Sequence, residues 1–331
     1  MCQIIVISTM SAGCAEFSYT TIRGQTMGTY FAIQYDARDC RIAQSDVEER
    51  LGELNQSLST YLPSSEISRF NTAPAQTTYD VSREFRHVLS AALLVGQQSR
   101  GAFDVTVGPL VERWGFGATE PRTAMPPTAE ELDEMRVYIG QQHLKLSAEG
   151  LRKDHPLVHI DLSALAKGFA VDALAELVED AACRNFMVDI GGEIRVAGMS
   201  RRGSAWRLGI ETPDAGQVGQ AQTVIELRDM AVATSGDYRN FRLVEGRRVH
   251  HVFDPRSATA SRSSVVSATV VHPQTMMADA YATTLMVLSL KEGLEFAAEF
   301  GLPVLLITRT QDGAVEIHLS EPMRDFLASN V

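Results

Sequence analysis

The sequence has few or none of several features that by themselves would assign a protein to a class. Its four cysteines (Cys2, Cys14, Cys40 and Cys183) are scattered without CxxC spacing, so we predict neither a zinc site nor a disulfide framework. Lys and Arg number 30 against 41 Asp and Glu, and the net charge of −11 argues against nucleic acid as the main partner. No apolar run is long enough to cross a bilayer.

Familiar nucleotide and acyl-transfer motifs are also missing. Neither a GxSxG elbow nor a GxxxxGK[ST] loop occurs. The double glycine within Val188–Ile194 lacks the GxGxxG spacing of dinucleotide-binding folds, so a Rossmann fold is a weak interpretation. Any phosphate site in so acidic a chain must be local, built from a metal ion, helix N-termini and a few basic residues.

The chain does contain enough material for one large core, since 45% of its 331 residues are hydrophobic. We see no fixed-period repeat and no linker, and therefore predict one α+β domain with mixed or antiparallel sheets and flanking helices. Capping boxes at Ser45/Glu48 and Thr128/Glu131 predict two helix starts. Periodicity predicts helices over 45–58, 82–98, 163–180 and 277–288, and strands over 20–36, 185–189, 193–197, 206–211 and 265–271.

The first nineteen residues form a separate segment with two interpretations. The sequence SAGC resembles the end of a bacterial lipoprotein signal, with Cys14 as the lipidated residue. An export signal requires a basic residue followed by a longer apolar stretch. Here the apolar stretch is short and no basic residue precedes it. The segment is therefore either a clipped or misassigned signal or a plain strand. The protein would accordingly act on the periplasmic side of the inner membrane as a lipoprotein, or in the cytoplasm.

An acidic helix near the C-terminus offers oxygen ligands. Asp279 and Thr283 are four residues apart, so their side-chain oxygens share one helix face. A carboxylate and a hydroxyl suit Mg²⁺, which binds oxygen and keeps waters or substrate phosphates in its shell. In the alternative interpretation, Asp279 caps the helix and Thr283 bonds back to its own helix backbone.

The stretch Asp161–Gly168, DLSALAKG, suggests an anion site at a helix start. Ser163 can cap the helix and leave backbone N–H groups for a phosphate or carboxylate. Lys167 lies close to the positive end of the helix dipole, where an anionic ligand would offset its charge. Asp161 is either a partner of the helix dipole or an acid that contacts the ligand.

A histidine pair, His250 and His251, falls in a predicted strand before Asp254. Adjacent strand residues point to opposite faces, so only one of the two can enter a site. A histidine with a near-neutral pKa is a general-base candidate, although a lone strand histidine is also a common structural residue. Asp254 either orients a histidine or begins an Asp-Pro turn.

Taken in order, these segments resemble the ApbE family of FAD:protein FMN transferases. The resemblance begins at Met27–Tyr30 and covers nearly the whole chain after about residue 23. It implies an ApbE-like, T-fold-like domain over 20–331. The motifs that carry it are MGTY, STYLPSSEISRFN, GAFDVTVGPLVERWGFG, DLSALAKGFAVD, DIGGEIRVAG, ATSGDYRNF, HHVFDPRS and ADAYATTLMVL.

The resemblance implies an enzyme that binds FAD and Mg²⁺. It would move FMN onto a threonine hydroxyl of an acceptor protein and release AMP. The acceptor would carry an [ST]GAT-like motif and be a flavin-carrying electron-transfer subunit. Matched positions imply that Met27, Tyr61, Ala102, Phe103, Asp104, Asp161, Lys167 and His250 bind FAD. They also imply that the Ala164 carbonyl, Asp279 and Thr283 bind the metal, and that His251 and Lys167 are catalytic.

One departure from the family pattern concerns the loop after Asp254. The family usually continues DPRTG, whereas this chain reads DPRSA, so Ala258 replaces a glycine that can adopt positive φ. We expect a reshaped loop here, with consequences for acceptor docking. Two other functions remain open from the sequence: a Mg²⁺-dependent FAD pyrophosphatase, and an FAD-binding protein without catalysis.

Overall fold

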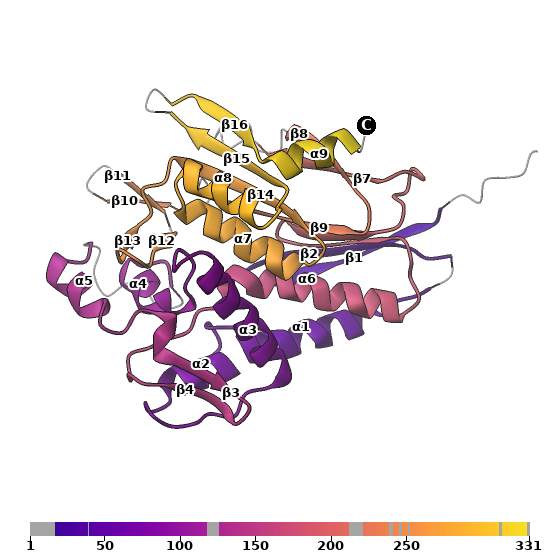
Figure 1. The fold of residues 1–331 in the computed structure, drawn as a ribbon. Helices are drawn as coiled ribbons and strands as arrows, with labels where there is room; N and C mark the ends of the chain where they lie inside the picture. The colour runs from indigo at the N-terminus through magenta and orange to yellow at the C-terminus, as the bar shows by residue number, and fades with distance from the viewer. Residues whose placement is uncertain are drawn as a thin grey trace, which may run out of the picture.

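The structure, a computed structural model, describes residues 17–38, 40–117, 126–211, 221–237, 241–244, 247–250, 252–310 and 313–329 (Figure 1). The helices are α1 (Gln44–Leu58), α2 (Glu66–Thr72), α3 (Arg83–Gln98), α4 (Gly108–Arg113), α5 (Ala129–Met135), α6 (Ser163–Asp180), α7 (Thr275–Val287), α8 (Leu290–Glu299) and α9 (Glu321–Ser329), with short 3₁₀ turns at Val105–Val107 and Gln141–His143. Residues 1–16, and Cys14 with them, lie outside this description, so the proposed lipidation site does too.

The centre of the fold is an antiparallel sheet of eight strands in the order β1-β2-β5-β6-β9-β14-β15-β16. These strands are β1 (Tyr19–Thr26), β2 (Thr29–Asp36), β5 (Phe186–Ile190), β6 (Glu193–Ala197), β9 (Met230–Gly236), β14 (Val265–His272), β15 (Val304–Arg309) and β16 (Val315–Leu319). Separate two-stranded pairs are β3 (Leu144–Ser147) with β4 (Gly150–Lys153), β7 (Trp206–Glu211) with β8 (Ala221–Leu227), β10 (Phe241–Val244) with β11 (Arg247–His250), and β12 (Phe253–Asp254) with β13 (Thr259–Ala260). The predicted α+β class with antiparallel sheets and flanking helices is confirmed.

Helices α6 and α7 cover one face of the sheet, and α1 and α3 lie beyond them (Figure 1). Their apolar residues share cores with strand residues: Leu174 of α6 and Phe186 of β5 belong to one core, and Leu285 of α7 and Leu306 of β15 to another. The other face packs against the β7–β8 pair, through Trp206 among others, and against α9. Strand side chains alternate between the two faces of a sheet, and here both faces are covered. The central strands are therefore apolar on both sides, and the sheet lies inside the molecule.

Most predicted elements form, but the predicted cap of α1 does not. Helix α3 begins after Ser82, whose side chain accepts the Phe85 N–H as an N-cap, and Thr128 makes its predicted capping box with Glu131. Helix α1 instead begins at Gln44, with Ala43 at the cap position and no side-chain cap bond. The Ser45/Glu48 capping box was therefore wrong, because the helix starts two residues too early for Ser45 to stand at its cap position.

Helices α6 and α7 approach so closely that Gly168, a residue of α6 that faces α7, has no room for a side chain. A Cβ added to Gly168 would lie 2.5 Å from the Thr275 carbonyl oxygen and 2.7 Å from the Met276 Cα. The joint is also tied by Asp172 of α6, whose carboxylate accepts the backbone N–H groups of Thr275 and Met276, each at 2.9 Å. Asp172 thus caps α7 from the neighbouring helix and sets the position of the residues one turn further along.

We expect Gly168→Ala to destabilise the protein by about 1–3 kcal/mol, because the methyl group meets backbone atoms that must shift. This sign is opposite to the usual effect, since glycine inside a helix is worse than alanine by about 0.5–1 kcal/mol. Gly52 in α1 is the matched control, because nothing lies within 4 Å of its added Cβ. Urea unfolding should show Gly52→Ala to be stabilising and Gly168→Ala destabilising; the same sign for both would contradict a steric role for Gly168.

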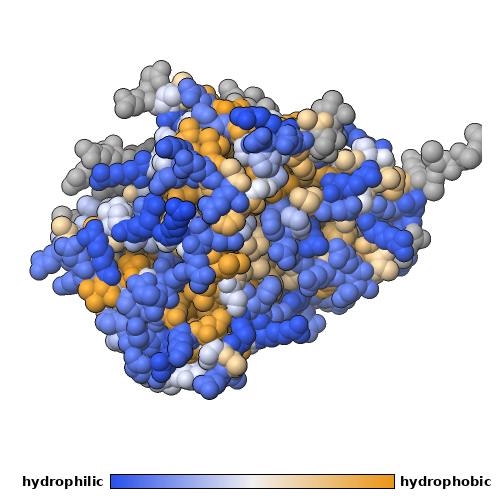
Figure 2. All heavy atoms as spheres, viewed as in Figure 1, coloured by the Kyte–Doolittle hydropathy of each residue, from blue (hydrophilic) through white to orange (hydrophobic). Residues whose placement is uncertain are grey.

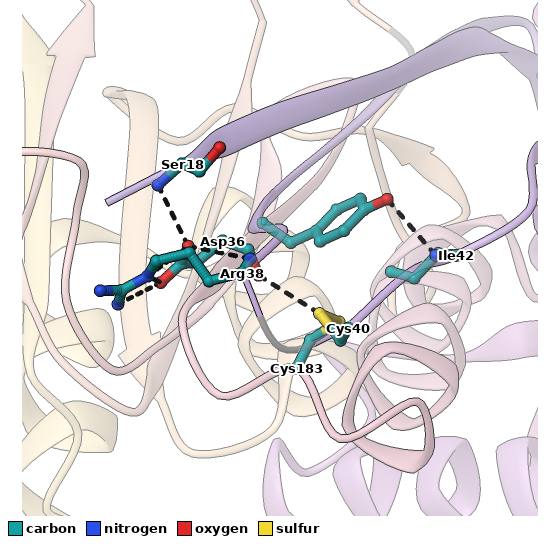
Figure 3. The surroundings of a disulfide bond; sticks show 7 residues. Ser18, Asp36, Arg38, Cys40, Ile42 and Cys183 are labelled. Atoms are coloured by element: carbon teal, nitrogen blue, oxygen red, sulfur yellow. Dashed lines mark hydrogen bonds and ion pairs between the residues drawn. A yellow bond between two sulfur atoms is a disulfide. The ribbon is translucent and has the colours of Figure 1, made fainter. Parts of the chain in front are cut away.

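The prediction that the cysteines form no disulfide was wrong. Cys40, before α1, and Cys183, after α6, form a disulfide; their Cα atoms are 5.4 Å apart and the two residues are 143 positions apart in sequence (Figure 3). Both residues are buried in the core between α1, α6 and the strands β2 and β5. Beside them Asp36 pairs with Arg38, and the Ile42 N–H donates to the Tyr35 hydroxyl at 3.3 Å. No CxxC spacing marks such a pair, because the fold alone brings the two residues together.

The face drawn in Figure 2 is mostly polar. Hydrophilic residues cover most of it, and hydrophobic residues show in smaller patches, some in the region of α3 and α4 and others nearer the top of the view. Exposed large apolar side chains include Leu94 in α3 and Val137 after α5. Among the described residues, no helix combines the length and apolar character that a membrane crossing requires.

Candidate functional site

A cavity of about 940 Å³ opens where α6, α7 and the central strands meet the loops before and after α4. Its size falls in the range of cofactor and substrate pockets. Sequence-predicted residues that line it are Tyr61, Ala102, Phe103, Asp104, Asp161, Ala164, Lys167, Asp279 and Thr283. Segments that are far apart in the chain thus contribute to one hollow.

Three of the predicted residues stand apart from this group. Met27 lies in the turn between β1 and β2 with φ of 49°, packs against the core under β2, and is not among the lining residues. His250 ends β11, but its side chain is not described. His251 lies outside the described residues. The predicted roles of the two histidines therefore stay predictions.

The start of α6 differs from the sequence prediction. The helix begins with Ser163 itself, and Leu162 occupies the cap position without a side-chain cap bond. Asp161 supplies the capping oxygen: its Oδ1 accepts the Ser163 N–H at 2.8 Å and also the Ser163 hydroxyl. Ser163 is therefore the residue that is capped, because Asp161 stands outside the helix where its carboxylate can reach the first N–H.

Asp279 and Thr283 lie on α7 as predicted, one turn apart and facing the cavity. Asp279 is only 2% exposed, and its Oδ2 accepts the Gly168 N–H of α6 at 3.1 Å. The Thr283 hydroxyl lies 3.3 Å from the Ser235 hydroxyl of β9. Asp279 does not cap α7, and the hydroxyl that bonds back to the helix belongs to Thr284, which donates to Ala280 at 2.8 Å. The alternative interpretation of this pair does not fit.

Lys167 reaches from α6 to two carboxylates on other elements. Its Nζ lies 3.4 Å from Glu193 Oε1 and 3.8 Å from Asp279 Oδ2. Burial opposes the charge of Lys167, but the two carboxylates together raise its pKa above the ordinary value. The charge near the helix start is thus matched by the protein itself. Its position alone therefore does not require an anionic ligand, contrary to our sequence argument.

Glu193 is the main residue that the sequence reasoning missed. It begins β6 directly after the double glycine, is 5% exposed and lines the cavity. Its Oε2 is buried without a hydrogen-bond partner among the described residues. Burial raises the pKa of Glu193 above its ordinary value; Lys167 opposes this rise and Asp279 adds to it. A glutamate at the start of a strand carries no distinctive local pattern, so only its surroundings identify it.

The opposite wall is formed by the loop after α3. Ala102 and Phe103 are buried, whereas Tyr61 is 65% exposed at the cavity edge. Asp104 already has partners within the protein: one carboxylate oxygen accepts the Thr106 N–H and the other the Gln141 N–H, both at 2.8 Å. Its carboxylate thus holds the loop in shape, so any ligand contact by Asp104 would be additional to this role.

Further lining residues complete the cavity. Asp189 of β5 accepts the Gly192 N–H at 2.9 Å and the Tyr30 hydroxyl at 3.1 Å, and burial raises the pKa of its carboxyl. Phe116 and Phe253 form an aromatic pair with ring centroids 6.0 Å apart. The cavity thus has an acidic end beside β5, β6 and α7 and an apolar, aromatic part, a combination suited to a large ligand with both kinds of group.

In the loop after Asp254, the alanine that stands in place of the family's glycine adopts a left-handed backbone conformation. Ala258 is buried and adopts φ of 53°, the left-handed region that glycine tolerates best. Asp254 holds the turn by accepting the Arg256 N–H at 3.0 Å, and Pro255 lines the cavity. The alanine thus takes up the strained conformation itself, at a cost of roughly 1–2 kcal/mol.

No group of three His, Cys, Asp or Glu side chains that could hold a metal occurs in the part of the chain that is described. The metal ligands expected from the sequence are of another kind: one carboxylate from Asp279, one hydroxyl from Thr283 and the Ala164 carbonyl. All three residues line the acidic end of the cavity. Such an oxygen set suits a hard cation that keeps water or substrate oxygens among its ligands.

Known proteins share both sequence and fold with this chain. The sequence profile of the ApbE family matches residues 27–306. An FAD:protein FMN transferase of Vibrio cholerae is 40% identical over 322 residues, 96% of each chain, and one of Escherichia coli K12 is 33% identical over 94% of this chain and 90% of its own. The flavin transferase ApbE from Vibrio cholerae superposes with a TM-score of 0.87 at 38% identity, covering 94% of this chain and all of its own. The apo flavinyl transferase ApbE of Pseudomonas stutzeri superposes at 0.86 and 32% identity, covering 95% and 98%. This chain belongs to the ApbE family.

Proposed function

We propose that the chain is a magnesium-dependent FAD:protein FMN transferase whose domain spans residues 20–331. The relatives that share its sequence over nearly their whole length are named FAD:protein FMN transferases, which supports flavin transfer to a protein. The observation that carries the proposal is the single cavity in which Lys167, Asp279 and Thr283 meet Tyr61 and Asp161. It offers cation-binding, phosphate-binding and aromatic groups together.

The acidic end of the cavity fits a divalent cation. Asp279 and Glu193 bring two carboxyl groups to one ammonium, that of Lys167, within a largely buried space. Burial penalises unbalanced charge, so a bound cation would relieve the surplus acid. Asp279, Thr283 and the Ala164 carbonyl would hold a magnesium ion, which when bound neutralises phosphate charge during transfer.

Other residues of the chain would bind and orient the dinucleotide. The Lys167 side chain is 31% exposed at the cavity and can reach a pyrophosphate oxygen. Tyr61 offers an exposed aromatic face for a flavin or adenine ring. Asp161 keeps the first turn of α6 in place by accepting the Ser163 N–H. These residues position the ligand, which is the main source of catalysis in phosphoryl transfer.

The proposed reaction forms one bond and breaks one. The hydroxyl oxygen of an acceptor threonine attacks the FMN phosphorus, the pyrophosphate P–O bond breaks, and AMP leaves with the electron pair. The threonine proton passes to a base, and family resemblance assigns that role to His251. A base of suitable pKa adds roughly 10²–10⁴-fold to such a rate. The acceptor would be a flavin-carrying electron-transfer subunit with an [ST]GAT-like motif.

An assay with FAD, Mg²⁺ and a synthetic peptide containing SGAT tests the proposal. We expect a peptide with the added mass of FMN and one AMP per modified peptide, both measured by mass spectrometry and chromatography. A peptide in which the threonine is replaced by valine is the control and should remain unmodified. Free FMN and AMP without modified peptide would instead indicate a pyrophosphatase. Retained FAD without AMP would indicate a binding protein.

The disulfide bears on where the protein acts. Disulfides form and persist in oxidising compartments such as the bacterial periplasm, and are rare in the cytosol. The buried Cys40–Cys183 bond therefore supports a proposal that the enzyme works on the periplasmic side of the membrane. Cell fractionation followed by thiol alkylation tests it. Recovery of the protein in the cytosol with both cysteines reduced would contradict the proposal.

A further inference from the structure

The two carboxylates around Lys167 come from different elements and have different surroundings. Asp279 lies in α7, one turn from Thr283, and also accepts the Gly168 N–H at 3.1 Å. Glu193 lies in β6, and its ion pair with Lys167 at 3.4 Å is the side-chain contact that the described part of the chain gives it. Asp279 is thus part of an oxygen set for a cation, whereas Glu193 faces the lysine.

A cation bound to Asp279 would weaken the ion pair between Asp279 and Lys167. The same Asp279 oxygen, Oδ2, lies 3.8 Å from the ammonium and accepts the Gly168 N–H, so three positive or donor groups would share one carboxylate. The cation and the ammonium also repel each other across a buried space where charges are poorly screened. Without a second counter-ion, Lys167 would compete with the cation for Asp279.

Glu193 is placed to prevent this competition. It approaches Lys167 from the sheet, on an element other than the helix that carries Asp279, and it is nearly fully buried and therefore held in place. We infer that Glu193 is a positioning residue that retains Lys167 and thereby leaves Asp279 available to a divalent cation. This inference rests on the proposed magnesium-dependent function.

The test measures cation binding directly, in the absence of FAD and turnover. Mn²⁺ replaces Mg²⁺ at oxygen ligands and is followed by electron paramagnetic resonance. We expect Glu193→Gln to raise the Kd for Mn²⁺ about tenfold, because the released lysine then pairs with Asp279. Lys167→Met removes the competitor, so adding Glu193→Gln to that variant should change the Kd less than about twofold. This pair of backgrounds forms a double-mutant cycle.

Each outcome is decisive. An equal weakening of Mn²⁺ binding in both backgrounds would overturn the inference, because Glu193 would then act by its own charge and not through Lys167. An unchanged Kd in Glu193→Gln would overturn it as well. Failure of the wild-type protein to bind Mn²⁺ would instead count against the proposed function. Asp189→Asn is the matched control for loss of a carboxylate in the same cavity, and circular dichroism checks that every variant is folded.

Discussion

Asp279→Ala is expected to lower the rate of AMP release from FAD by at least about 10²–10³-fold, while weak FAD binding remains. Removing one preorganised group that stabilises transition-state charge costs about this much, and Asp279 would exert the effect through the cation that it helps to hold. The effect should be large here because Asp279 is buried, contacts Lys167 and Gly168, and is the carboxylate among the expected cation ligands. AMP release is measured by chromatography over a range of Mg²⁺ concentrations.

The isosteric variant Asp279→Asn separates charge from packing in this experiment. Asparagine keeps an oxygen that can accept the Gly168 N–H, so the α6–α7 joint should hold while the charge is lost. We expect it to be nearly as inactive as the alanine variant and to melt close to the wild-type temperature. Full activity of either variant would remove the cation from the mechanism.

Removing the disulfide should give the largest loss of stability. We expect the double variant Cys40→Ala/Cys183→Ala to lose about 2–5 kcal/mol of unfolding free energy, since a cross-link between distant residues strongly restricts the unfolded chain. The bond joins residues 143 positions apart, which makes the closed loop long. Guanidinium unfolding of the wild type and the variant measures the difference.

Activity serves as the control for this second prediction. Neither cysteine lines the cavity, so the double variant should keep most of its flavin transfer at low temperature, where it is still folded. Wild-type protein treated with reductant should lose stability to a similar degree once the buried bond is reduced. Equal stability of variant and wild type would show that the disulfide contributes little.

Long periodic segments were predictable from the sequence because their patterns are local. The helix over 163–180 was predicted with the bounds that the structure gives, and the helix over 82–98 begins at the predicted cap, Ser82. Local capping was less predictable: the cap of α1 lies two residues before Ser45, and Asp161 rather than Ser163 supplies the cap oxygen of α6. Caps depend on one residue's backbone angles, which periodicity does not determine.

In the candidate site, too, the residues that belong to local patterns were predictable and those that meet only in the fold were not. Asp279 and Thr283 share a helix face by their spacing alone, the helix start in DLSALAKG indicated Lys167 and Asp161, and the motif resemblance supplied Tyr61. Glu193 escaped notice because no spacing rule connects it to Lys167 or Asp279. The resemblance also implied Met27, which does not line the cavity. The roles of His250 and His251 stay predictions, since neither side chain is described.

Residue order thus suffices for this protein's long periodic helices, much of its strand pattern and its membership of a family, because each follows from neighbours along the chain or from motifs in sequence. It does not suffice for contacts between distant segments. The Cys40–Cys183 bond, the Asp172 cap on α7 and the Lys167–Glu193–Asp279 cluster each join elements of different parts of the chain. They arise only when α6 and α7 pack side by side on the sheet, since packing decides which distant side chains share a buried space.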